Sequence, residues 1–146
     1  CSSLTSLNVS SWDTAGVTDM SYMFRNCGRL TSLDVSSWDT SDVTNMNNMF
    51  LGCGSLTSLD VSSWDTGKVS NMRNLFRECS KLTAIDVSSW SICSIIAAGS
   101  FPYMLAAAGI RIMSPPPAIC LRYAKTFREG KELLSMTRIR IRLTPA

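Results

Sequence analysis

Hydrophobic residues return every 26 positions along residues 1–90, so this part of the chain is a tandem repeat. Six residue types keep that step in register. Their series are Leu4/Leu30/Leu56/Leu82, Val9/Val35/Val61/Val87, Met20/Met46/Met72, Phe24/Phe50/Phe76, Cys1/Cys27/Cys53/Cys79 and Trp12/Trp38/Trp64/Trp90. A single unit of this size cannot bury its own apolar side, so stacked units must share a core. We therefore expect these series to form continuous interior rows over three full units and a partial fourth.

The first part of each unit has the pattern of a short strand. In residues 30–36, Leu33 and Val35 alternate with polar residues, which places them on one face of an extended segment. Asp34 and Ser36 then fall on the opposite face. The spacing Leu-x-x-Leu-x-Val is similar to that of leucine-rich repeats.

The second part of each unit has helical spacing. Between residues 43 and 53 the apolar positions fall at offsets 0, 3, 6, 7 and 10, which is one stripe along a helix of about three turns. Ser41 or Asp42 precedes this run and could cap it, and Gly52 and Gly54 let the chain leave it. The predicted fold class is α/β, a leucine-rich-repeat-like solenoid with one short strand and one short helix per 26-residue repeat and a non-repeat C-terminal segment.

The repeat ends at Trp90, and an apolar segment follows over residues 91–113. Residues 92–110 contain no charged side chain, which meets the lower length range of a membrane-spanning helix. The positive charges that follow would place the tail in the cytoplasm and the repeats outside. The Gly and Pro residues in this segment favour instead a cap on the repeat stack, and a reading-frame shift in the gene is a third explanation.

Residues 114–146 form a Pro linker and a basic tail. Pro115, Pro116 and Pro117 favour a stiff, extended connection. Residues 1–90 contain 6 Lys and Arg against 9 Asp and Glu, a net charge of −3, whereas residues 91–146 contain 8 against 2, a net charge of +6. The tail could contact anionic lipid, but it lacks interleaved aromatic residues and any nucleic-acid motif, so no nucleic acid is expected as a partner.

The chain contains no histidine, which excludes Ser-His-Asp and Cys-His catalysis and imidazole metal ligands. Cys27, Cys53 and Cys79 lie on the predicted inward stripe, where we expect reduced thiols that act as small apolar residues. No close Cys pair completes a zinc site. A regular repeat presents like groups in rows, not converging unlike groups, so we expect no enzyme activity, cofactor or metal.

The exposed face of the predicted strand holds the candidate partner-binding residues. They are Thr31, Asp34, Ser36, Thr57, Asp60, Ser62, Thr83 and Asp86. Stacked like charges favour cations, basic partners or hydrogen bonds to Ser and Thr, although a solvated polar face and a calcium site are alternatives. Asp13, Asp39 and Asp65 each follow Trp in a turn, where we expect them to bond main-chain N–H groups. The Trp series is expected in the core or at its edge.

The stretch LTSLDVSSWDTSDVTNMNNMFLGCGS (residues 30–55) resembles the repeat of BspA-type leucine-rich-repeat surface proteins, also known as the mycoplasma surface-lipoprotein repeat. The resemblance covers residues 1–90. It implies a solenoid on a cell surface with a role in adhesion or matrix contact. Cys1 would be lipidated in a lipoprotein, but it also falls in register with the other repeat cysteines.

Three functions remain open from the sequence. The first is a cell-surface scaffold, with attachment to the membrane through residues 92–110, that binds proteins or matrix and surface macromolecules through the strand face. The second is a structural spacer array without a specific ligand. The third is a surface that orders ice or mineral, against which the charged Asp rows count.

Overall fold

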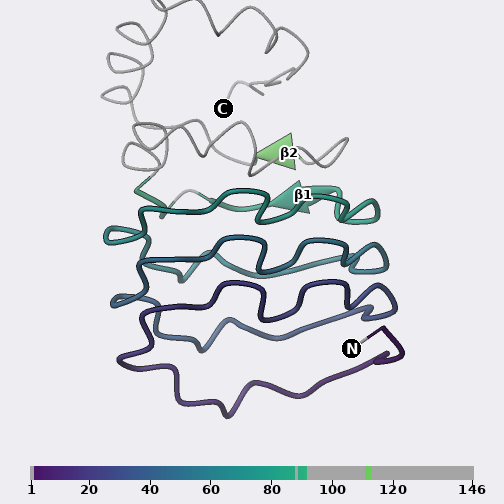
Figure 1. The fold of residues 1–146 in the computed structure, drawn as a ribbon, viewed down its shortest axis with the longest axis horizontal. Helices are drawn as coiled ribbons and strands as arrows, with labels where there is room; N and C mark the ends of the chain where they lie inside the picture. Colours follow the sequence, from purple (N-terminus) through teal and green to yellow (C-terminus); the bar gives the residue numbers. More distant parts are fainter. Residues whose placement is uncertain (1, 88, 92–110, 113–146) are drawn as a thin grey trace, which may run out of the picture.

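The computed structural model of the chain describes residues 2–87, 89–91 and 111–112. We number the repeats as unit 1 (residues 1–26), unit 2 (27–52), unit 3 (53–78) and the partial unit 4 (79–90). Figure 1 shows the chain making one circuit per unit, with successive circuits lying one above another and unit 1 at the bottom. Parallel bridges join Asp19 to Asn45 and Asn45 to Asn71. Residues 26 positions apart are therefore neighbours in space.

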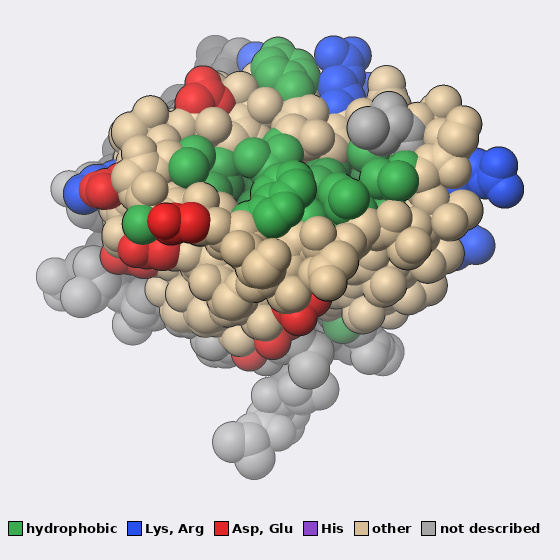
Figure 2. Space-filling view, turned by 90° about the horizontal axis from the view of Figure 1, so that it is seen from below, with side chains coloured by type: hydrophobic (Ala, Val, Ile, Leu, Met, Phe, Trp, Pro, Cys, Tyr) green, Lys and Arg blue, Asp and Glu red, His purple; other side chains and the backbone are tan. Residues whose placement is uncertain are grey.

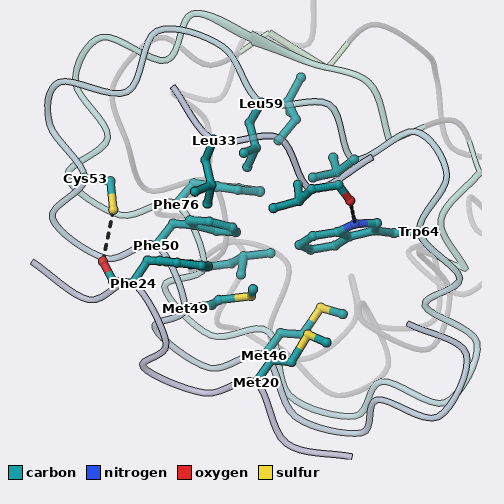
Figure 3. Close-up of a cluster of buried hydrophobic side chains, with 14 of the residues drawn as sticks. Met20, Phe24, Leu33, Met46, Met49, Phe50, Cys53, Leu59, Trp64 and Phe76 are labelled. Carbon is teal, nitrogen blue, oxygen red and sulfur yellow. Dashed lines mark hydrogen bonds between the residues drawn. The ribbon is translucent and has the colours of Figure 1, made fainter. Parts of the chain in front are cut away.

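The predicted interior rows are confirmed. The Leu30, Val35, Met46, Phe50, Cys53 and Trp64 positions and their described counterparts in adjacent units are buried and belong to one core cluster, except that Leu4 is only partly buried and Trp12 is exposed. Figure 3 shows the rings of Phe24, Phe50 and Phe76 one behind another, with centroids 5.5 and 5.7 Å apart. Trp12 departs from its row, because 43% of its surface is exposed whereas Trp64 is fully buried.

The predicted helix over residues 43–53 is wrong: the residues that the structure describes form no helix. The inward stripe is there, but the backbone takes another path. Alternate N–H groups donate to carbonyls of the next unit, as from Met46 to Asn71 (2.8 Å), Asn48 to Arg73 (2.9 Å) and Phe50 to Leu75 (3.0 Å). Between them, Met49 donates to the carbonyl of Met46 within the unit, and Asn47 donates to the side-chain oxygen of Asn45. Each unit therefore bonds mainly to its neighbour in this segment and does not close on itself as a helix.

Left-handed backbone conformations explain why the helix does not form. Residues with positive φ recur at two positions of units 1 to 3, namely Tyr22/Asn48/Asn74 and Asn26/Gly52/Glu78, and Gly16 in unit 1 is a further one. A positive φ interrupts a right-handed helix, and Asn and Gly adopt it most readily. Gly52 has a φ of 76°, so its conformational freedom is used as predicted. It is used inside this non-helical segment of the unit, which we call the arc, and not at a helix end. The caps predicted at Ser41 and Asp42 are therefore also wrong.

Among the described repeat units the predicted strand is formed only in unit 4, as β1 (Ala84–Ile85), so the prediction of one strand per repeat is wrong for units 1 to 3. It pairs in parallel with β2 (Arg111–Ile112), with Ala84 opposite Arg111 and Ile85 opposite Ile112. In units 2 and 3 the equivalent segments keep the alternation of buried and exposed residues. They are joined across units by long main-chain bonds, from Thr31 to Thr5 (3.4 Å) and from Thr57 to Thr31 (3.3 Å).

The predictions for the C-terminal part concern residues 92–110 and 113–146, which lie outside the described residues. This applies to the proposed membrane span or cap, the Pro linker and the basic tail. Within the described part of the chain, no helix has the length and apolar character needed to cross a membrane.

The buried Trp row should contribute strongly to stability. Trp64 donates its indole N–H to the carbonyl of Val35 (3.2 Å) and packs on both sides. We expect Trp64→Phe to lower the free energy of unfolding by about 2 kcal/mol, from the lost bond and the cavity. Trp12→Phe is the matched control and should cost less than about 1 kcal/mol. Urea unfolding measures both, and equal costs would contradict the burial described above.

Candidate functional site

The eight predicted binding residues all have exposed side chains. Leu33 and Val35 point inward between them and are buried, so the predicted alternation holds and Asp34 and Ser36 face outward. We call this set the Thr–Asp–Ser face, which consists of Thr31, Asp34, Ser36, Thr57, Asp60, Ser62, Thr83 and Asp86. Because the units stack in register, each residue type forms a row along the array.

Each described Asp–Ser pair of this face forms a tight local turn. The Oδ1 atom of Asp34 accepts hydrogen bonds from the main-chain N–H of Ser36 (3.2 Å) and from its hydroxyl (2.6 Å). Asp60 accepts the same two bonds from Ser62, at 3.0 and 2.6 Å. Bonds from a side chain to the residue two positions on are typical of Asx turns. They hold the carboxylates in the same orientation in successive units.

The Thr hydroxyls are also engaged. Thr31 and Thr57 donate to the main-chain carbonyls of Thr5 and Thr31, at 3.4 and 3.3 Å. The hydroxyl protons of Ser36 and Ser62 are directed to Asp34 and Asp60. The face therefore offers a partner mainly acceptors, namely the second carboxylate oxygens and the hydroxyl lone pairs.

Hydrogen bonding lowers the pKa of these carboxyl groups. The Ser36 hydroxyl and then its N–H lower the pKa of Asp34, and the neighbouring charge of Asp60 opposes this only weakly. Ser62 lowers the pKa of Asp60 in the same way. Both carboxylates are ionised at neutral pH, so the face is a row of fixed negative charges.

A second Asp row has the structural role that its place in the sequence predicted. Asp13, Asp39 and Asp65 accept hydrogen bonds from the N–H groups two residues on, at 3.1, 2.9 and 2.8 Å. Asp42 has no helix to cap and instead pairs with Lys68 (2.6 Å). Both of these side chains are about half exposed, so the pair adds little stability.

The cysteines behave as small core residues. Cys27, Cys53 and Cys79 are free and buried. The Sγ atoms of Cys53 and Cys79 donate to the carbonyls of Phe24 and Phe50, each at 3.1 Å, and Figure 3 shows the first of these bonds. Burial raises the pKa of Cys53 to about 12 and that of Cys79 to about 11. Both thiols are therefore protonated near neutral pH, whereas the thiolate is the form that acts as a nucleophile.

Two polar rows were missed by the sequence interpretation. Thr14, Thr40 and Thr66 are buried, and the first two donate to the carbonyls of Asp39 (3.0 Å) and Asp65 (2.9 Å) in the next unit. The recurrence of Thr two residues after Trp12, Trp38 and Trp64 could have revealed this row. The other row, Asp19/Asn45/Asn71, carries the parallel bridges. Among the described residues, no three Asp, Glu or Cys side chains converge on a site for a metal ion.

The stacked units in one register define a tandem-repeat protein whose exposed chemistry is a set of polar rows. The chain matches the family described as "Mycoplasma protein of unknown function, DUF285" over residues 1–108, and it belongs to that family. The match continues past Trp90, where the 26-residue repeat ends. No curated protein and no solved structure matches the chain.

The Asp60 turn can be tested by titration. The pKa of Asp60 is lowered in the folded chain, so the stability it contributes is present above its unfolded pKa of about 3.9 and is lost as the pH falls through the folded value. Ser62→Ala should raise the pKa of Asp60 measured by NMR. Ser63→Ala is the control, because the Ser63 hydroxyl donates to the main-chain carbonyl of Ser36. This variant should leave the pKa of Asp60 unchanged. A Ser62→Ala variant without a shift would contradict the turn.

The buried thiols should resist alkylation. At mildly alkaline pH an exposed thiol, with a pKa of about 8.5, reacts readily with iodoacetamide. We expect Cys53 and Cys79 to stay unmodified in the folded chain and to react fully in denaturant, as read by peptide mass mapping. Their raised pKa values also mean that stability is complete below about pH 8.5 and declines as the pH rises towards the folded values. Rapid labelling of Cys53 in the folded state would show that the core opens.

Proposed function

We propose that the chain is a non-enzymatic, cell-surface repeat protein that binds other macromolecules through the Thr–Asp–Ser face. The observation that carries the proposal is the fixed row of ionised carboxylates at Asp34 and Asp60. Each is held by two bonds from the Ser two residues on and lies on an exposed face that repeats with the array.

The chemistry of the face indicates the class of partner. Carboxylate oxygens and engaged hydroxyls accept hydrogen bonds but have few protons to donate, so a fitting partner supplies cations or N–H and O–H donors. Proteins with Lys- and Arg-rich segments and hydroxyl-rich matrix polymers meet this requirement. Each contact is exposed and weak, and affinity would come from several units engaging one extended partner.

The proposal includes a fold class and a location. We place the array among BspA-type, leucine-rich-repeat-like solenoids, modified in that the described units replace the predicted helix with an arc bonded to the next unit. Membership of a family of mycoplasma proteins supports, together with the repeat itself, a position on the cell surface. Attachment through residues 92–110 remains a prediction.

A charge-removing variant tests the face without disturbing its turns. In unit 1 the equivalent of Asp34 is Asn8, whose Oδ1 accepts the same bonds from the N–H (3.1 Å) and hydroxyl (2.8 Å) of Ser10. The triple change of Asp34, Asp60 and Asp86 to Asn therefore keeps the turn and removes the negative row. We expect it to weaken binding of a matrix extract and of a Lys-rich model peptide at least about tenfold, a loss of about 1.4 kcal/mol, as measured by biolayer interferometry.

The matched control changes Asp13, Asp39 and Asp65 to Asn, which removes the same charge from the other Asp row. Binding should be retained in this variant. Equal losses of binding in both variants would show that binding depends only on net charge, which would contradict a specific binding face. A folded chain that binds neither probe would favour the structural spacer, and thermal hysteresis in the unmodified chain would favour the ice-ordering surface.

A further inference from the structure

The end of the stack formed by unit 1 exposes apolar surface. Figure 2 looks at this end from below and shows hydrophobic side chains gathered across its middle. Trp12, Tyr22 and Met23 are the exposed large hydrophobic residues of the described chain, and all three belong to unit 1. Leu4, Leu7 and Val17 of the same unit are only partly buried against the core. The core rows thus reach the surface here.

The Trp row shows what is absent at this end. Trp38 stacks on Trp12 of the preceding unit (5.9 Å) and on Phe24 (6.0 Å), and its indole N–H donates to the Val9 carbonyl (3.1 Å). Trp64 and Trp90 make the same three contacts with the unit before them. Within the described residues, Trp12 has none of the three.

The backbone of unit 1 shows the same pattern. In units 2 and 3 a row of main-chain carbonyls accepts the N–H groups of the preceding unit; these carbonyls belong to Asn45, Asn47, Met49 and Leu51 and to Asn71, Arg73, Leu75 and Arg77. The corresponding carbonyls of unit 1 belong to Asp19, Ser21, Met23 and Arg25. None of these accepts a hydrogen bond from the described residues. An unpaired row of this kind is a template for one more backbone.

We propose that this end is a docking site for one more unit of the same 26-residue repeat. The interface between units 1 and 2 and that between units 2 and 3 already show the fit. Such a unit supplies a row of N–H donors for the unpaired carbonyls of unit 1. It also supplies the two aromatic rings and the Val carbonyl that Trp12 lacks as partners. Two unit 1 ends placed face to face would set one carbonyl row against the other, and two rows of acceptors form no hydrogen bonds with each other.

The test is an extended chain in which a copy of residues 27–52 directly precedes Cys1, so that every series stays in register. Hydroxyl-radical footprinting with peptide mapping reports on Trp12, Tyr22 and Met23 separately. We expect the oxidation rate of Trp12 to fall to that of Trp64 in the same molecule, and the midpoint of urea unfolding to rise. The destabilisation by W12F should also grow from the small value of the original chain to that of W64F.

The control extension carries Ser at the counterparts of Trp38 and Phe50, and should leave Trp12 as reactive as in the original chain. A second extension, with residues 53–78 ahead of Cys1, guards against failure of one particular junction. Unchanged Trp12 reactivity in both intact extensions, or failure of both to fold, would overturn the proposal. So would concentration-dependent protection of Trp12 in the original chain with dimerisation in sedimentation, because the face would then pair with itself.

Discussion

Main-chain hydrogen bonding between successive units is the interaction on which the rest of the structure depends. Met20, Tyr22, Phe24 and Asn26 donate to carbonyls 25 residues further on, and unit 2 repeats the pattern towards unit 3. These bonds fix one register for the whole stack. Once the register is fixed, equal side chains fall above one another, so the apolar series become core rows and the polar series become surface rows. Neither kind of row could exist in an isolated unit.

The candidate site is a by-product of the same geometry. The alternation of Leu33 and Val35 with Asp34 and Ser36 directs the first pair inward and the second outward, and the Asx turn then orients the carboxylate. Repetition along the array turns a local turn into a row of like charges. The bonds from Ser36 and Ser62 lower the pKa of both carboxyl groups, and the charge of Asp60 opposes this only weakly at Asp34. Structural and chemical roles are therefore combined in the same residues.

The sequence predicted the side-chain arrangement far better than the backbone path. The apolar series and the exposed Thr–Asp–Ser face follow from period and alternation alone, and the structure bears both out. The helix prediction was wrong because an inward stripe at Val43, Met46, Met49 and Phe50 specifies which side chains are buried. It does not specify which acceptors the main-chain N–H groups bond to. Asn48 and Gly52, which adopt positive φ, were the available sign of a non-helical arc. The buried Thr row was overlooked because Thr is usually found at the surface.

The shared register also limits how the length of such a chain can vary. Adding or removing one residue inside residues 30–36 would turn Leu33 and Val35 to solvent and would put this one unit out of register with the unit on either side. A gain or loss of one whole circuit leaves all remaining contacts as they were. Duplication and deletion within the gene are thus tolerated in steps of 26 residues, and the reach of the protein can change between generations without any redesign of its interior.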